Sequence, residues 1–172
     1  MKITLIANMS IDGKITKGED HRIRSWTSSE DVAFFEGMIA SHDLLVMGRK
    51  TYQAIRVKTD EAKRYVVMTH TPELFASHTI EGQLEFSGED PRALARRMEN
   101  AGYTKLLLTG GGHAYTSFLE AGLVDEFYIT IEPYIFGEGT DLLARRTLNI
   151  KLTLENVRRL NDTGTVLLHY IA

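Results

Sequence analysis

Three consecutive glycines, Gly110, Gly111 and Gly112, are the strongest chemical feature of the sequence. They follow a short apolar run and precede a segment with helical periodicity, which predicts a strand-to-helix turn. Glycine lets a backbone approach a phosphate closely, and a helix beginning near His113 would direct free N–H groups at that anion. The pattern indicates a phosphate-binding turn; a tight turn without a ligand is the alternative.

A second strand–glycine–helix junction lies at residues 47–52, with the sequence MGRKTY. Gly48 is followed there by Arg49, Lys50 and Thr51. Because basic residues at a helix start oppose the helix dipole, stability alone does not favour them in this place. A bound anion would explain them, and two solvated surface charges are the alternative.

Thr69 and His70 follow the third predicted strand and offer a hydroxyl and an imidazole for another phosphate. Neither the P-loop pattern nor a G-x-G-x-x-G turn after the first strand is present, so a dinucleotide would have to be held by several turns together. No metal site is expected, because the sequence has no cysteine and its histidines include no pair at ligand spacing. The histidines are at positions 21, 42, 70, 78, 113 and 169.

Asp31 is the candidate acid of the site. As a carboxylate at a helix start beside a partly apolar cleft, it could protonate or stabilise a cationic nitrogen of a substrate. Trp26 would supply the apolar wall, with a partly buried core aromatic as the alternative. For Asp31 the alternative is structural, since Ser28 three residues earlier completes a capping-box pattern. A polar loop over residues 14–25 precedes the helix, and its basic residues fit a solvated loop better than a phosphate site.

The elements that must position these residues alternate between strand and helix. Strands are predicted over residues 3–7, 44–47, 65–68, 84–86 and 106–108. Helices are predicted from residue 28, from residue 48, over 91–100 and over 115–121. Three further strands without intervening helices follow over 126–132, 152–157 and 165–170.

This order predicts an α/β fold with three αβα layers, a mainly parallel sheet and an antiparallel C-terminal edge. Residues 1–172 are expected to form a single domain. Ligands of such sheets bind outside the carboxyl ends of the strands, so Asn8, which follows the first strand, joins the candidate residues.

The composition limits the classes of function. The chain has 172 residues, of which 43% are hydrophobic and 25% charged, as in a globular protein. A net charge of −3 argues against a general nucleic-acid binder. The N-terminal apolar run is too short for a signal peptide, and no run is long enough for a membrane helix. We therefore expect a soluble cytoplasmic protein with no membrane partner.

The sequence resembles the dihydrofolate-reductase-like family, and within it the RibD C-terminal reductase domain of riboflavin biosynthesis. MSIDGKIT (9–16) and TGGGHAYTSFLEAGLVDEFYITIEPYIFGEG (109–139) are similar to motifs of that reductase. MGRKTY (47–52) and DVAFF (31–35) look more like dihydrofolate reductase itself.

The resemblance implies NADPH as the cofactor. It would place the backbone of Ala7 against the nicotinamide carboxamide and Thr69 and His70 near the adenosine 2′-phosphate. The remaining cofactor contacts would be made along the phosphates by Gly48, Arg49, Lys50, Thr51, Gly110, Gly111, Gly112 and His113.

For the substrate, the resemblance implies that Asp31 is the catalytic acid and that Asn8, Asp12, Lys14 and Trp26 are substrate contacts. The expected reaction is hydride transfer to a C=N bond of a pyrimidine or pteridine, most like the 5-amino-6-(5-phosphoribosylamino)uracil reductase of riboflavin biosynthesis. A dihydrofolate reductase and a non-catalytic NADP-binding module are the alternatives. A homodimer is consistent with the resemblance, because similar proteins often pair.

Overall fold

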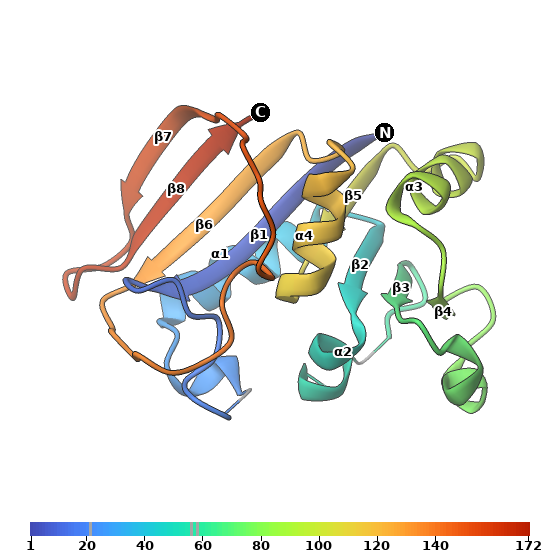
Figure 1. Cartoon of the computed structure of the whole chain (residues 1–172), viewed down its shortest axis with the longest axis horizontal. Coiled ribbons are helices and arrows are strands. Elements are labelled where there is room, and N and C mark those ends of the chain that lie inside the picture. Colours follow the sequence, from blue (N-terminus) through green and yellow to red (C-terminus); the bar gives the residue numbers. More distant parts are fainter. Residues whose placement is uncertain (21, 56, 58) are drawn as a thin grey trace.

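Eight strands form one twisted sheet in the order β4-β3-β2-β5-β1-β6-β8-β7 (Figure 1). The computed structural model describes residues 1–20, 22–55, 57 and 59–172; His21, within the predicted loop, lies outside them. The strands are β1 (Lys2–Ser10), β2 (Leu44–Gly48), β3 (Arg64–Met68), β4 (Leu84–Ser87), β5 (Lys105–Leu108), β6 (Glu126–Glu132), β7 (Thr153–Arg159) and β8 (Val166–Ile171). All the predicted strands are therefore confirmed, with ends that differ by a few residues.

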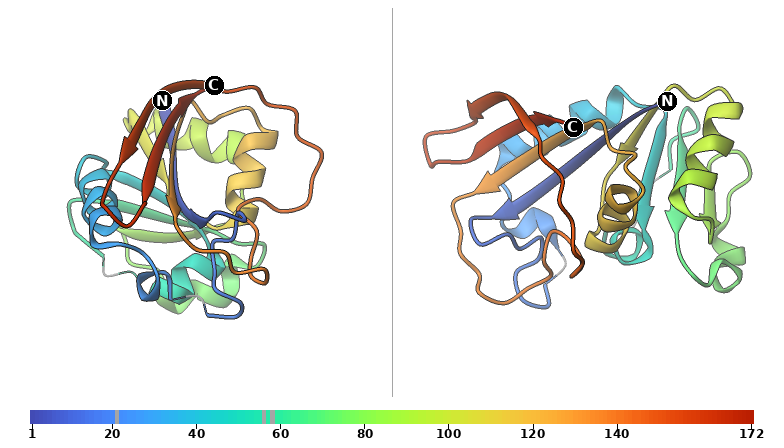
Figure 2. Two further views of the ribbon diagram at one scale, coloured as in Figure 1. Left: turned by 90° about the vertical axis from the view of Figure 1, so that its left-hand side faces the viewer. Right: turned by 45° about the horizontal axis from the view of Figure 1, so that its top comes forward.

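Helices cover both faces of the sheet, so the three-layer prediction is confirmed (Figure 2). The helices are α1 (Ser29–Ala40), α2 (Arg49–Ile55), α3 (Pro91–Asn100) and α4 (Gly112–Glu120). Two short 3₁₀ helices, η1 (Ile23–Ser25) and η2 (Pro72–His78), were not predicted. Alternate residues of β1 face opposite layers: Leu5 packs in the core under α3 and α4, and Ile6 in the core under α1.

The sheet is parallel from β4 to β6. β1 is central and pairs with β5 on one side and with β6 on the other. Of the three closing strands, β6 belongs to the parallel part, and the antiparallel pairing is made by β8 with β6 and with β7. In the β1–β6 pair, Asn8 is opposite Thr130 and Ser10 is opposite Glu132, which sets polar residues together where both strands end.

The start and the end of α1 are both fixed by side chains. Ser28 is the N-cap, and its Oγ accepts a hydrogen bond from the backbone N–H of Asp31 at 3.3 Å. At the other end, the Lys63 ammonium donates to the carbonyl oxygens of Ile39 and His42, each at 2.9 Å. A cation there complements the negative end of the helix dipole, so α1 is fixed at both ends.

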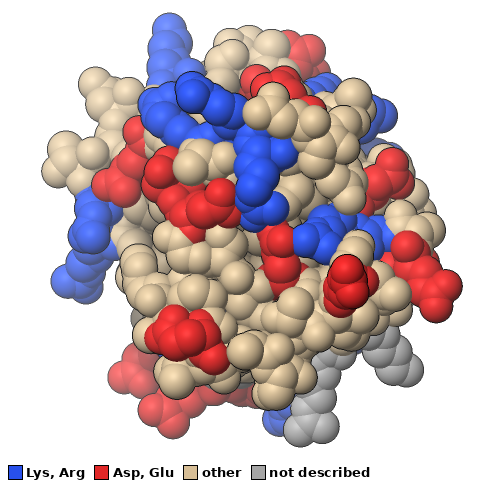
Figure 3. All heavy atoms as spheres, turned by 90° about the vertical axis from the view of Figure 1, so that its right-hand side faces the viewer, with Lys and Arg blue, Asp and Glu red and all other residues tan. Residues whose placement is uncertain are grey.

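Charges of both signs are interspersed on the side of the molecule that carries α3 and β4 (Figure 3). There Arg97 of α3 pairs with Glu85 and with Glu89, each at 2.6 Å. No helix within the described ranges has the length and apolar character that crossing a bilayer requires.

Candidate active site

A buried polar cluster lies where β1 and β6 end and α1 begins. Its members come from three elements and are all less than 9% exposed: Asn8, Ser10, Asp31, Thr130 and Glu132. Polar side chains are seldom buried at this density without hydrogen-bonding or functional reasons, so the cluster is the centre of the candidate site.

Asp31 is the acidic group of this cluster that faces β1. Asn8 Nδ2 donates a hydrogen bond to Asp31 Oδ2 at 2.6 Å. Burial raises the pKa of the Asp31 carboxyl above its ordinary value; the Asn8 hydrogen bond opposes this rise, and the nearby charge of Glu132 adds to it. Asp31 therefore keeps its proton to higher pH than an exposed aspartate, as a general acid requires.

Three buried polar atoms in this region have no hydrogen-bond partner among the described residues. They are Asn8 Oδ1, Thr130 Oγ1 and Trp26 Nε1. Unpaired buried donors and acceptors are costly, and substrate atoms can satisfy them when a ligand binds. Asn8 and Thr130 are facing residues of β1 and β6, and both lie beside the Asp31 carboxyl.

The two predicted glycine turns meet at the neighbouring ends of β2 and β5. The backbone N–H of Gly48 donates to the carbonyl oxygen of Gly110 at 2.6 Å. Gly110 has a φ of +129°, and a Cβ on Gly110 or Gly111 would lie 3.2 or 3.1 Å from Thr51 Oγ1. The junctions thus form one crowded cradle, in which a Cβ on Gly110 or Gly111 would require Thr51 to shift.

Gly112 begins α4 under a further constraint. A Cβ at this position would lie 2.9 Å from the carbonyl oxygen of Asp141. The helix has neither an acidic residue in its first turn nor a side-chain cap, so its first N–H groups are left for another acceptor. Behind the cradle, Tyr115 OH donates to the carbonyl oxygen of Ile6 at 2.6 Å and holds α4 against β1, with burial raising the pKa of this phenol.

The other predicted cofactor residues lie near the carboxyl ends of the same parallel strands and differ in their exposure to solvent. Ala7 is buried in β1, and Thr69 is half-buried after β3. The cationic or titratable candidates are all exposed: Arg49, Lys50, His70 and His113. Arg49 and Lys50 open α2, and His113 is in the first turn of α4, so all three residues are close in sequence to the glycines of the cradle. The Arg49 side chain donates to Gln53 Oε1, one turn further along α2, at 3.3 Å.

Asp12 and Lys14 connect their loop to the segment over residues 133–142. Asp12 accepts hydrogen bonds from the backbone N–H groups of Phe136 at 3.1 Å and Gly137 at 2.7 Å. Lys14 forms an ion pair with Asp141. Both side chains, predicted from the resemblance as substrate contacts, thus have partners within the chain that hold two loops together.

Trp26 is also tied to that segment. Its indole is 6% exposed and packs edge-to-face on Phe136, with ring centroids 5.1 Å apart. Trp26 is thus a buried aromatic that packs on half-buried Phe136, as the alternative interpretation expected, and its role as an apolar wall for a substrate stays a prediction. The unpaired Nε1 of Trp26 is the polar end of this aromatic pair.

Three residues of the cluster, Ser10, Thr130 and Glu132, were not predicted from the sequence, and Glu132 is the acidic one. It is 2% exposed, accepts from the Ser28 N–H at 2.7 Å and accepts from Thr165 Oγ1 at 2.6 Å. A signal was present, because Glu132 stands in phase with Thr130 on the α1-facing side of a strand that is otherwise largely apolar.

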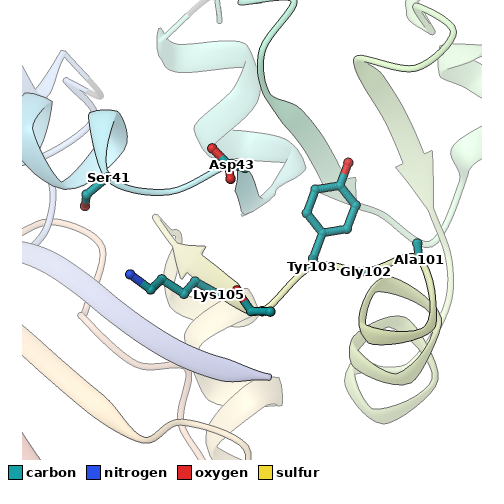
Figure 4. A pocket seen from close by; sticks show the side chains of 7 residues that line it. Ser41, Asp43, Ala101, Gly102, Tyr103 and Lys105 are labelled. Carbon is teal, nitrogen blue, oxygen red and sulfur yellow. The ribbon is translucent and has the colours of Figure 1, made fainter.

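One hollow of about 350 Å³ lies at the opposite ends of the strands, near the amino ends of β2 and β5 (Figure 4). Its charged side chains, Asp43 and Lys105, are exposed to solvent. Because open α/β sheets bind ligands at the carboxyl ends of their strands, we assign the site to the buried polar cluster and the cradle.

Comparison with known proteins supports the assignment of the fold and of the family. The family model described as RibD C-terminal domain matches residues 1–166. The uncharacterized protein YwjB of Bacillus subtilis (strain 168) is 27% identical over 177 residues, covering 99% of this chain and 97% of that protein.

Solved structures share the fold at low sequence identity. A pyrimidine reductase-like protein from Corynebacterium diphtheriae superposes with a TM-score of 0.79 at 16% identity, covering 99% of this chain and 91% of its own. The Thermotoga maritima diaminohydroxyphosphoribosylaminopyrimidine deaminase/5-amino-6-(5-phosphoribosylamino)uracil reductase gives 0.74 at 18%, over 99% of this chain and 56% of that one. Dihydrofolate reductase from Enterococcus faecalis, complexed with NADP(H), gives 0.66 at 19%, over 99% and 95%.

Proposed function

Because the chain belongs to the RibD C-terminal domain family, we propose that it is an NADPH-dependent reductase that transfers hydride to a C=N bond. The substrate class is a pyrimidine or pteridine, with 5-amino-6-(5-phosphoribosylamino)uracil favoured. The observation that carries this proposal is the buried Asp31 carboxyl paired with Asn8 of β1. The glycine cradle begins at the end of β5, the strand next to β1, so both features lie at the carboxyl ends of the parallel strands.

The cradle has the properties that a dinucleotide phosphate requires. A Cβ on Gly110 or Gly111 would crowd Thr51, one on Gly112 would meet the backbone of residues 141 and 142, and α4 begins there without an acidic residue. Arg49 and Lys50 add positive charge beside it. We assign these residues, with Ala7, Gly48, Thr51, Thr69, His70 and His113, to the cofactor.

In the proposed reaction the bound NADPH supplies the hydride, and the protein provides placement and a proton. Asp31 is the proton donor to the substrate nitrogen, because burial raises the pKa of its carboxyl and so favours the protonated form. Asn8 fixes the orientation of the carboxyl, and its free Oδ1 is an acceptor for a substrate N–H. Placement of the reactants contributes roughly 7–11 kcal/mol to lowering a barrier of this kind.

Two other functions use the same residues. A dihydrofolate reductase would also need a buried acid at the start of α1, and the shared fold favours this second candidate. A non-catalytic module would bind NADPH at the cradle and reduce nothing.

The first test uses Trp26, the single tryptophan of the chain. We expect titration with NADPH to quench its fluorescence with transfer to the nicotinamide and to raise Tm, with NADH as the comparison. A protein that responds to neither nucleotide would refute the proposal. The Arg92→Ala variant, at an exposed arginine of α3, is a control that should bind like the wild type.

The second test is NADPH oxidation with each candidate substrate. Turnover of 5-amino-6-(5-phosphoribosylamino)uracil without turnover of dihydrofolate supports the favoured substrate. Turnover of dihydrofolate that methotrexate inhibits identifies the second candidate instead. NADPH binding without oxidation in either assay indicates the non-catalytic module.

A further inference from the structure

Glu132 is a buried carboxylate that the proposed reaction does not use. It is the last residue of β6 and is 2% exposed, and no cationic partner is recorded for it among the described residues. Both of its oxygens accept hydrogen bonds, one from the Ser28 N–H and one from the Thr165 hydroxyl. Burying a carboxylate without a counter-ion costs free energy, so we expect Glu132 to have a role that offsets this cost.

That role follows from the way α1 is capped. In a capping box, the residue three positions after the N-cap accepts a hydrogen bond from the N-cap N–H. The first half of this pattern is present, because Ser28 Oγ accepts from the Asp31 N–H. The second half is replaced: the Ser28 N–H donates to Glu132, and the Asp31 carboxylate accepts from Asn8.

We propose that Glu132 is a positioning residue for Asp31: it takes the Ser28 N–H that the Asp31 carboxylate would otherwise cap, and so leaves that carboxylate to face Asn8 and the substrate. The inference rests on the proposed function in one respect, namely that Asp31 acts on a substrate. The exchange of capping partners is itself a feature of this chain and is open to direct measurement.

Glu132 is itself held by the turn between β7 and β8. Thr165 is completely buried and donates to Glu132 Oε2 at 2.6 Å. Asn161 Nδ2 donates to Thr165 Oγ1 at 2.9 Å and to Glu30 Oε2 at 3.2 Å. The hairpin turn is thus linked to the start of α1 by two sets of hydrogen bonds, one through buried Glu132 and one to exposed Glu30.

The charge of Glu132 gives it a second effect on Asp31. The groups that face Asp31 are Asn8 from β1 and Thr130 and Glu132 from β6. On α1 itself, Glu30 points to solvent and to Asn161. Glu132 is the charged group that acts on Asp31, and its negative charge favours the protonated form of that carboxyl.

The experiment compares Glu132→Gln with Glu132→Ala and uses Glu30→Gln as the matched control. Glutamine keeps an acceptor for the Ser28 N–H but removes the charge, whereas alanine removes both. Glu30→Gln removes a carboxylate from the same turn of α1 at an exposed position. The primary measurement needs no ligand: the ¹³C carboxyl signals of labelled aspartates are titrated with pH, and the Asp31 signal is assigned as the one lost in Asp31→Asn.

We expect the titration midpoint of Asp31 to move to lower pH in Glu132→Gln and to stay unchanged in Glu30→Gln. Where the wild type turns over, the falling limb of kcat against pH should move in the same direction, with each pH unit costing about tenfold in kcat above the midpoint. The KM for NADPH should stay within about twofold, because the cradle is untouched. In Glu132→Ala, the Asp31 carboxyl should be drawn to the Ser28 N–H, with a further loss of kcat.

An Asp31 midpoint that is the same in Glu132→Ala as in Glu132→Gln overturns the inference, because only alanine removes the acceptor for the Ser28 N–H. An equal movement in Glu30→Gln overturns it as well. Should Glu132→Ala fail to fold, Glu132→Met takes its place, because methionine fills the space without providing that acceptor. The proposed function fails separately, if Asp31→Asn retains full turnover or if no nucleotide binds, and the carboxyl titration is readable in either case.

Discussion

Asn8 Nδ2 lies 2.6 Å from Asp31 Oδ2, and this hydrogen bond joins the end of the central strand to the first turn of α1. The strand is held by neighbours on both sides and the helix by its own caps. A carboxyl fixed in this way has one orientation and little water around it. These conditions raise the pKa of a carboxylic acid and so favour the protonated form that can donate to a ligand.

Replacing Asp31 with asparagine should remove the proton donor without disturbing the fold. We expect kcat to fall by about 10²–10⁴-fold and the affinity for NADPH to stay nearly unchanged. The cap of α1 survives, because it uses the backbone N–H of residue 31 and the hydroxyl of Ser28. Steady-state kinetics and a nucleotide titration check this; a collapse of NADPH binding would identify Asp31 as a structural residue.

The same variant should change how stability depends on pH. Because the pKa of Asp31 is raised above its ordinary value of 3.8 in the folded state, the group's contribution to stability is fully present below that value and is lost as pH rises through the folded pKa. Asp31→Asn does not titrate, so its Tm relative to the wild type should increase from acid to neutral pH. Thermal melts across pH 3–8 measure this difference, and a flat difference would show that Asp31 is not desolvated.

Gly112 and Gly37 form a matched pair for testing the cradle. A Cβ at Gly112 would meet the backbone of residues 141 and 142, so Gly112→Ala should cost about 1–3 kcal/mol and weaken NADPH binding. A Cβ at Gly37, on the exposed side of α1, would meet nothing within 4 Å. Gly37→Ala should therefore stabilise the protein by about 0.5–1 kcal/mol. Denaturant unfolding of both variants is the measurement, and equal effects would contradict the crowding of the cradle.

Asp12 should stabilise the loops only in its ionised form. Its hydrogen bonds from Ser10, Phe136 and Gly137 lower its pKa to about 2, so this stabilisation is present above the ordinary value of 3.8 and is lost as pH falls through 2. In Asp12→Ala, the amide protons of Phe136 and Gly137 should exchange faster at neutral pH, and Tm should fall by a few degrees. Glu19→Gln, at an exposed carboxylate of the same loop, is the control that should leave both unchanged.

The fold was predictable because local sequence patterns specify its strands, its helices and the turns between them. Short β-branched runs alternate with segments of helical spacing, and Gly48 and Gly110 mark the turns between them. The parallel order of the strands then brings these two turns together, which the hydrogen bond between Gly48 and Gly110 shows directly. The sequence thus predicted the two turns, and the strand order of the structure brings them together.

The side-chain partners were less predictable, because they are distant in the sequence. Asp12 and Lys14 contact residues more than a hundred positions away, in a loop whose path no local pattern specifies. Ser28 and Asp31 match a capping box at the start of α1. The acceptor for the Ser28 N–H is nevertheless Glu132, at the end of β6. Local spacing predicted that the helix would be capped and could not identify which carboxylate would do it.

The central position of β1 also bears on synthesis of the chain. Residues of β1 pair with Lys105–Leu108 and with Glu126–Glu132, so both neighbours of this strand leave the ribosome long after it does. Until then, a nascent chain exposes an apolar strand with two unpaired edges, the kind of segment that invites association with other chains. Chaperone capture during translation is the consequence we expect of placing the first strand in the middle of the sheet.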